Sequence, residues 1–139
     1  MVDVENVAKK DKPTFRNIGL GQLIHYRLPW AGKVSILHRI SGAALFLLLP
    51  FILYLFDQSL ASELSYQKFQ ALTSNVLVKL ICLGLIWCFL HHFCAGIRYL
   101  LLDLEIGVEK SKANRSAIIV FSLGLALTAI VGLKLFGFY

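Results

Sequence analysis

Charged residues are scarce in this chain. Asp, Glu, Lys and Arg make up 16% of its 139 residues, whereas 58% are hydrophobic. Soluble domains carry about 25% charged residues, and so short a chain cannot bury this much apolar surface away from water. The composition therefore excludes a soluble domain and is typical of a small membrane protein.

Cysteines are few, and their spacing excludes two kinds of site. Cys82, Cys88 and Cys94 follow at intervals of six residues, which advance a helix by about 240° per step, so the thiols point to three faces and cannot converge on a metal. The sequence also lacks C-x-x-C-H, the motif for covalent c-type haem attachment. Any haem here would be of the b type.

Motifs of other protein classes are missing too. There is no dinucleotide-binding fingerprint and no cysteine cluster for an iron-sulfur centre. The net charge of +6 does not predict nucleic-acid binding, because the basic residues flank the apolar runs and no soluble domain presents a basic face. Met1 to Asp11 has no apolar core, so we expect no secretory signal peptide.

Three apolar runs have the length of about 20 residues that a bilayer requires. They predict membrane-spanning helices at about residues 35–56, 76–102 and 116–136. In the third, Gly124, Thr128 and Gly132 recur every four residues, which favours close packing against another helix. We predict an all-α integral membrane protein with three transmembrane helices, forming one membrane-anchor domain over residues 1–139.

The polar segments complete this organisation. Residues 1–34 form a polar arm that ends in a short interfacial segment, at about 21–30, with Tyr26 and Trp30 as boundary aromatics. Residues 57–75 contain no Gly or Pro and predict a short connector with one surface helix. Residues 103–115 form a charged connector, in which Gly107 can end a helix.

The distribution of Lys and Arg predicts the orientation. Basic residues concentrate in the N-terminal arm up to Arg39 and around the 103–115 connector, whereas the first connector has only Lys68. By the positive-inside rule the N-terminus faces the cytoplasm, or the matrix in an organelle, and residues 57–75 face the opposite side. We expect a multi-pass protein of the bacterial inner membrane, with the mitochondrial inner membrane as the alternative.

The central span carries two adjacent histidines, His91 and His92. An intramembrane histidine is a functional hypothesis by default, and imidazole is a common axial ligand of haem iron. At about 100° per residue, His92 shares a stripe of small residues with Gly84, Cys88 and Gly96, whereas His91 points about 100° away. We interpret His92 as the candidate ligand, and expect His91 to meet a neighbouring helix or a buried polar contact.

A second polar group lies at the start of the first span. On a helix Ser35, Arg39 and Gly42 share one face, and His38 lies about 60° to its side. A hydroxyl, a guanidinium and an imidazole would thus gather at one boundary of the membrane. From the residues alone, a ligand site and simple contact with lipid phosphates are both open.

These two segments resemble one known family. Ser35 to Gly42 reads S-I-L-H-R-I-S-G and is similar to the S-x-x-H-R-x-S-G motif of the cytochrome b membrane-anchor subunit of succinate dehydrogenase, respiratory complex II. His92 to Asp103 resembles that family's second motif, H-x-x-x-G-[IL]-R-[HF]-x-x-x-D. The resemblance extends from about Lys12 to the end of the chain.

The resemblance implies roles for individual residues. It makes His92 an axial ligand of haem b, and it places Ser35 and Arg39 at the ubiquinone site. His38 falls near a haem propionate, with Arg98 as a further propionate candidate. The chain departs from the family at Tyr99, where relatives often have a second histidine.

Two further departures lie at the end of the second motif. Leu102 replaces a more usual aromatic residue or methionine, and Glu105 stands where a small residue often follows the aspartate.

The expected depths of the histidines bear on the second iron ligand. With about 1.5 Å of rise per residue, His92 lies roughly 9 Å deeper than Arg98, whereas His38 adjoins Arg39 at the expected membrane boundary. His38 is then at the wrong depth to pair with His92, and His91 points elsewhere. We therefore expect the other histidine to come from a second membrane-anchor subunit, with one haem shared between the two.

The expected function is a membrane-anchoring haem b subunit of a succinate:quinone oxidoreductase, which contributes to the ubiquinone-reduction site. Its expected partners are a flavoprotein subunit, an iron-sulfur subunit, the second anchor and the lipid bilayer. Succinate oxidation belongs to a partner subunit. The alternatives are the anchor of a quinol:fumarate reductase and a structural anchor without redox function.

Overall fold

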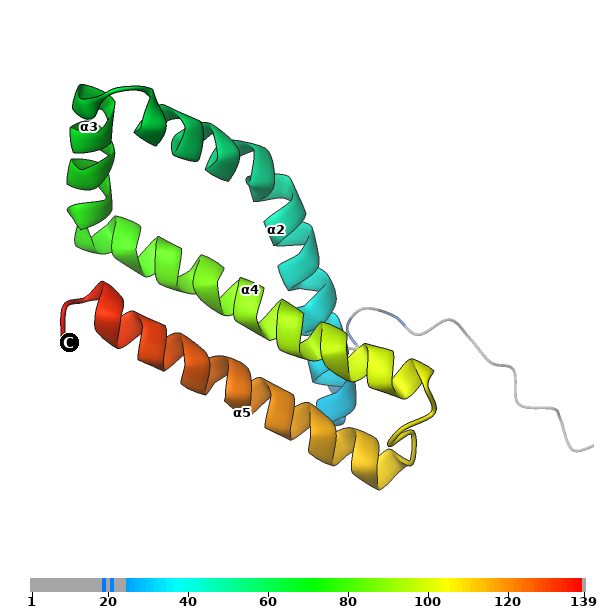
Figure 1. The fold of residues 1–139 in the computed structure, drawn as a ribbon. Coiled ribbons are helices and arrows are strands. Elements are labelled where there is room, and N and C mark those ends of the chain that lie inside the picture. Colours follow the sequence, from blue (N-terminus) through cyan, green and yellow to red (C-terminus); the bar gives the residue numbers. More distant parts are fainter. Residues whose placement is uncertain (1–18, 20, 22–24, 139) are drawn as a thin grey trace, which may run out of the picture.

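The computed structural model describes residues 19, 21 and 25–138, and its helices are labelled as in Figure 1. They are α2 (Trp30–Ala61), α3 (Glu63–Ser74), α4 (Val76–Asp103) and α5 (Lys110–Leu135). Most of the expected polar arm, and residues 22–24 of the expected interfacial segment, lie outside the described residues.

Three of these helices are long and apolar enough to cross a membrane: α2 with 32 residues, α4 with 28 and α5 with 26. The prediction of an all-α membrane protein with three spans is confirmed. The helices extend beyond the predicted apolar runs, since α2 begins at Trp30 and α5 at Lys110. Hydrophobicity marks only the part of a helix that lies in hydrocarbon, whereas the hydrogen-bonded backbone continues into the polar boundary.

The predicted surface helix between the first two spans is α3. It begins after Ser62, whose side-chain oxygen accepts a hydrogen bond from the backbone N–H of Ser65 at 3.1 Å. Asn75 ends α3 and caps α4 in turn, because its side-chain oxygen accepts from the N–H of Leu77 at 2.9 Å. Such caps satisfy backbone donors that the first turn of a helix leaves without partners.

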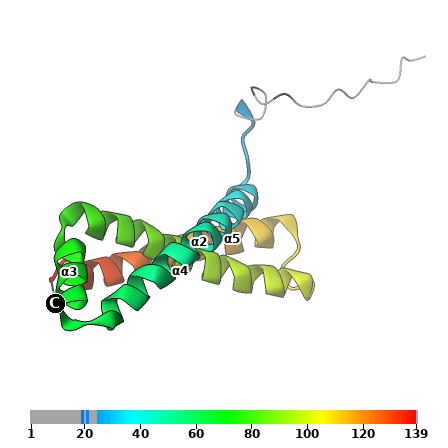
Figure 2. The same ribbon diagram turned by 90° about the horizontal axis from the view of Figure 1, so that it is seen from above.

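Helices α4 and α5 run antiparallel and side by side, and α2 crosses them near its beginning (Figures 1 and 2). The predicted small-residue stripe of α5 is buried in this packing. A Cβ atom at residue 124 would lie 3.4 Å from Cα of His91, and one at residue 132 would lie 3.0 Å from a methyl carbon of Leu83. The stripe thus brings α5 close to α4, as expected.

The first half of α2 contacts both other spans, whereas its second half diverges from α4 and is joined to it through α3 (Figure 1). The ring of Trp30 lies 5.6 Å from that of Phe121 on α5, and the N–H of Ala31 donates to Oδ1 of Asn114 at 3.3 Å. These contacts fix the beginning of α2 beside the first half of α5.

The core of the bundle is small. Val34, Ala95 and Ala117 are fully buried, whereas large apolar side chains such as Phe46 and Leu47 are more than 70% exposed. The bundle therefore presents most of its apolar surface outward, which suits contact with lipid or with other membrane subunits.

Candidate functional site

The crossing of α2 and α4 brings His38 and His92 together. Their rings are stacked, with centroids 4.1 Å apart and planes inclined by 6°. The predicted difference in depth between them is therefore wrong. It assumed that the first span begins near residue 35, but α2 begins at Trp30, so His38 lies more than two turns inside the helix and level with His92.

The ring of His92 is held by hydrogen bonds to α2. Its Nδ1 lies 3.0 Å from the backbone carbonyl oxygen of His38 and 3.4 Å from Oγ of Ser41. The Ser41 hydroxyl donates in turn to the same carbonyl at 3.0 Å. A carbonyl oxygen can only accept, so we assign the proton of a neutral His92 to Nδ1, which leaves a free electron pair on Nε2.

Glycines make this close approach possible. A Cβ atom at residue 42 would lie 2.6 Å from Cε1 of His92, closer than real Cβ contacts, so any other residue there requires the His92 ring to shift. Across the pair, a Cβ atom at Gly96 would lie 3.8 Å from Nε2 of His38, an ordinary contact. The sequence alone indicates no separate function for Ser41 or Gly42, although both belong to the first motif.

His91, the neighbouring residue on α4, is completely buried and lies against α5. Its ring stacks on Trp87 at 5.2 Å and meets Phe121 of α5 edge-on at 6.2 Å. The expectation that His91 meets a neighbouring helix is confirmed. Nε1 of Trp87 has no hydrogen-bond partner among the described residues.

Arg98 reaches α5 and does not reach the histidine pair. Its Nε donates to Oγ of Ser116 and its Nη2 to the carbonyl oxygen of Ala113, both at 2.9 Å. Tyr99 lies between the two groups, with its ring 5.2 Å from the Arg98 guanidinium and 5.0 Å from the His38 ring. Sequence spacing indicated neither this link to α5 nor the part that Ser116 plays in it.

The predicted quinone residues lie on α2, just before and just after His38. Ser35 is half-buried and Arg39 is exposed. Neither side chain has a hydrogen-bond or ion-pair partner among the described residues, so both are available to a ligand, to lipid or to another subunit. Both residues flank His38 on the same helix.

The fold and the site together define a class: a small bundle of three membrane-spanning helices with histidines held where two spans cross. The sequence pattern of the family described as "Succinate dehydrogenase/Fumarate reductase transmembrane subunit" matches residues 9–131. The chain belongs to this family.

Curated relatives are similar over most of their length. A succinate dehydrogenase cytochrome b556 subunit of Coxiella burnetii is 34% identical over 111 residues, which cover 79% of this chain and 89% of the relative. The subunit of the same name from Paracoccus denitrificans is 31% identical over 108 residues, covering 76% and 83% respectively.

Proposed function

We propose that this chain is the membrane-anchoring cytochrome b subunit of a succinate:quinone oxidoreductase and that His92 binds the iron of a haem b. The main support is the hydrogen bonding of the His92 imidazole. Its Nδ1 is bound to a backbone carbonyl of α2, while Nε2 has no partner among the described residues. Metal-binding histidines almost always donate their other ring N–H in this way. The names of the relatives support the same cofactor.

The residues around His92 fit a haem. When bound, a haem b supplies a one-electron carrier whose potential depends on its axial ligands and their hydrogen bonds. His38 lies beside the ligand, where it can contact a propionate. Arg98 has one guanidinium nitrogen, Nη1, that its bonds to α5 leave for such a contact.

The second axial ligand is proposed to come from another anchor subunit. To hold one iron together, two imidazoles would each have to aim a ring nitrogen at it. His38 and His92 are stacked face to face instead, and His91 is buried against α5. The orientation of these rings therefore supports a shared haem, although His38 and His92 lie at the same level.

Ser35 and Arg39 are proposed to bind ubiquinone. A serine hydroxyl can donate to one quinone carbonyl, and a guanidinium stabilises negative charge that develops on the oxygen during reduction. Arg39 keeps its charge at any physiological pH, so its function would be electrostatic and not proton donation. Their position near the basic ends of the spans suits electrons that arrive from a soluble iron-sulfur partner.

The chain would anchor a flavoprotein and an iron-sulfur subunit, which together oxidise succinate, at the cytoplasmic face of a bacterial inner membrane. The exposed apolar surface of the bundle is available to a second anchor subunit and to lipid. The family description includes fumarate reductase, whereas the relatives named above are succinate dehydrogenase subunits, which supports the succinate-oxidising direction.

Two histidine variants test the haem assignment. His92→Leu should abolish the dithionite-reduced b-type absorption of membranes that contain the assembled complex, because coordination is lost while Leu remains favourable in hydrocarbon. His91→Leu is the matched control and should retain the signal. Loss of the signal in His91→Leu alone would reverse the assignment, and a complex with no b-type signal at all would favour a purely structural anchor.

A further inference from the structure

One turn of α2, residues 38–42, encloses one edge of the His92 ring. Nδ1 faces the carbonyl oxygen of His38 at 3.0 Å and Oγ of Ser41 at 3.4 Å, and Cε1 faces the backbone of Gly42. Ser41 is almost fully buried, at 1% exposed. Three groups on one turn of α2 thus fix the orientation of the His92 ring on α4.

The hydrogen bonds determine where the proton of His92 lies. If Nδ1 carried the electron pair, it would face the lone pairs of a carbonyl oxygen 3.0 Å away, and this contact would be repulsive. The Ser41 hydroxyl could not relieve it, because its proton is already donated to that carbonyl. With the proton on Nδ1, the same contact is a hydrogen bond. The His38 carbonyl belongs to the backbone, so no change of side chain at residue 38 removes this preference directly.

The glycine determines how deeply the ring lies against α2. A methyl group at residue 42 would approach Cε1 to 2.6 Å, Nδ1 to 3.1 Å and Nε2 to 3.6 Å. The opposing atom belongs to a ring that is stacked on His38 and hydrogen-bonded at Nδ1, so it cannot move aside without losing these contacts. A side chain at residue 42 would therefore expel His92 from its position.

We infer that residues 38–42 form a positioning cradle for His92, in which the His38 carbonyl and Ser41 fix the proton on Nδ1 and Gly42 provides the space that lets Nε2 face a ligand. The inference rests on the proposed function of His92. It assigns Ser41 and Gly42 as positioning residues that act through His92.

Gly42→Ala in the complete complex tests the cradle. We expect its affinity for added haem to fall by at least about tenfold, the usual scale for losing a group that orients a metal ligand. Ala stabilises helices relative to Gly, so a loss of haem would not reflect a weakened α2. Gly32→Ala is the matched control on α2, because a Cβ atom there would make only ordinary contacts, the nearest at 3.4 Å to a methyl carbon of Leu28, and its haem affinity should equal that of the parent.

A double-mutant cycle separates the cradle from general packing. In the haem-free complex, Gly42→Ala should lower the thermal unfolding temperature relative to the parent. When His92→Ala has already removed the ring, adding Gly42→Ala should lower that temperature very little. If Gly42→Ala lowered the unfolding temperature equally with and without the His92 ring, the proposed cradle would be wrong.

The haem measurements distinguish this failure from that of the proposed function. If His92→Leu loses haem but Gly42→Ala binds it like the parent, the ligand assignment stands and the cradle is wrong. If His92→Leu retains haem, both are wrong.

Discussion

Arg98 is the only lysine or arginine that is buried in the described part of the chain, at 5% exposed. A buried guanidinium requires partners, since an unpaired charge away from water is costly. Arg98 has two hydrogen bonds to α5 and the face of Tyr99, but no carboxylate of the described residues lies within 4 Å. The described residues therefore supply its guanidinium with hydrogen-bond acceptors but with no counter-charge.

Replacing Arg98 should weaken the link between α4 and α5. We expect Arg98→Leu to destabilise the bundle by about 1.5–3 kcal/mol, the usual contribution of a hydrogen bond to a charged group. Arg98→Lys should recover only part of this, because an ammonium group lacks the planar fork that reaches Ser116 and Ala113 together. The thermal unfolding midpoint of the purified complex measures both.

Lys112→Leu is the control for Arg98, since the Lys112–Glu109 ion pair is about two-thirds exposed at both residues. Its midpoint should stay near that of the parent, because exposed ion pairs contribute little. A midpoint in Arg98→Leu equal to that of the control would show that the hydrogen bonds to α5 do not hold the bundle together.

The quinone assignment predicts a selective defect. Losing one donor to a developing negative charge costs on the order of 10²-fold in rate, so Ser35→Ala and Arg39→Leu should each strongly reduce succinate-driven ubiquinone reduction. Succinate oxidation with a soluble dye that accepts electrons before the quinone should be retained. Ser59→Ala is the matched control, because Ser59 is a buried serine at the other end of α2.

Arg39→Lys refines this test. A planar, two-pronged contact with the ligand predicts partial loss, whereas contact with lipid phosphates predicts none. If both Ser35→Ala and Arg39→Leu reduced ubiquinone at the parental rate, the quinone site would lie elsewhere.

At the scale of the elements, α4 and α5 end in the same backbone motif with different residues. After α4, the N–H of Ile106 donates to the carbonyl of Leu101 and that of Glu105 to Leu102. After α5, the N–H groups of Phe138 and Gly137 donate in the same pattern. This is the Schellman motif, whose left-handed residue is usually glycine, yet Glu105 occupies it after α4 with φ of 61°.

The two helix ends give a matched pair of substitutions. Glu105→Gly should stabilise the protein by up to about 1 kcal/mol. A left-handed conformation costs an L-residue roughly 1–2 kcal/mol, and part of this gain is offset because glycine loses more conformational entropy on folding. Gly137→Ala, where φ is 79°, should destabilise it by a similar amount. Unfolding midpoints that move the same way for both variants would contradict this account.

Helix spacing was a reliable guide within each element and a poor one between elements. It separated His91 from His92 correctly, and it predicted the packing of Gly124 and Gly132, because both follow from the 3.6-residue repeat. It failed for the depth of His38, since the level at which α2 crosses α4 is set by contacts between helices. The functions of Ser41 and Gly42 depend on that crossing and could not be read from either helix alone.

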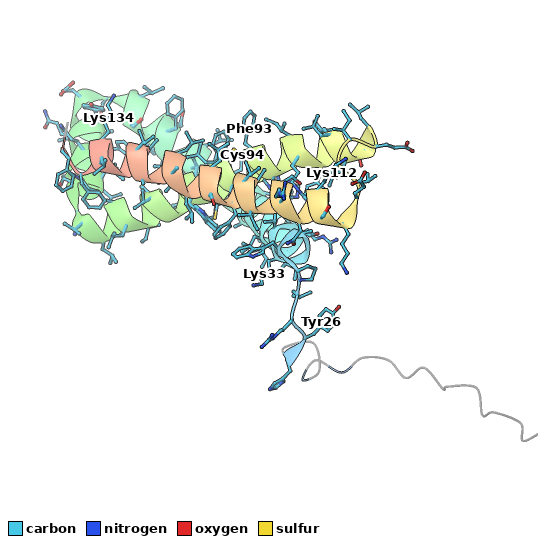
Figure 3. All side chains as sticks on the ribbon, turned by 90° about the horizontal axis from the view of Figure 1, so that it is seen from below. Tyr26, Lys33, Phe93, Cys94, Lys112 and Lys134 are labelled. Atoms are coloured by element: carbon cyan, nitrogen blue, oxygen red, sulfur yellow. The ribbon has the colours of Figure 1, made fainter. Side chains whose placement is uncertain are left out.

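At the scale of the whole molecule, the basic residues are distributed unequally between the two ends of the three-helix bundle. The beginnings of α2 and α5 and the end of α4 share one end of the bundle, and Figure 3 shows Lys112 and Lys134 at opposite ends of α5. The first end carries Lys33, Arg39, Lys110, Lys112 and Arg115. The other end carries Lys68, Lys79 and Lys134. This asymmetry supports a cytoplasmic location for the first end.

Cysteine labelling tests the orientation. Tyr66→Cys places a thiol on α3, where Tyr66 is 49% exposed, and Lys112→Cys places one at the other end of the bundle. In intact cells stripped of their outer membrane, a membrane-impermeant maleimide should label residue 66 and leave residue 112 unlabelled. In inside-out vesicles the pattern should reverse.

The parental chain is the background control for this labelling, because its three free cysteines all lie on the membrane-spanning α4. The opposite pattern would place Ser35, Arg39 and the His38–His92 pair in the outer half of the membrane. Electrons from a cytoplasmic iron-sulfur subunit would then have to cross most of the bilayer to reach the proposed quinone site. The labelling pattern therefore tests the orientation of the chain and the proposed path of the electrons together.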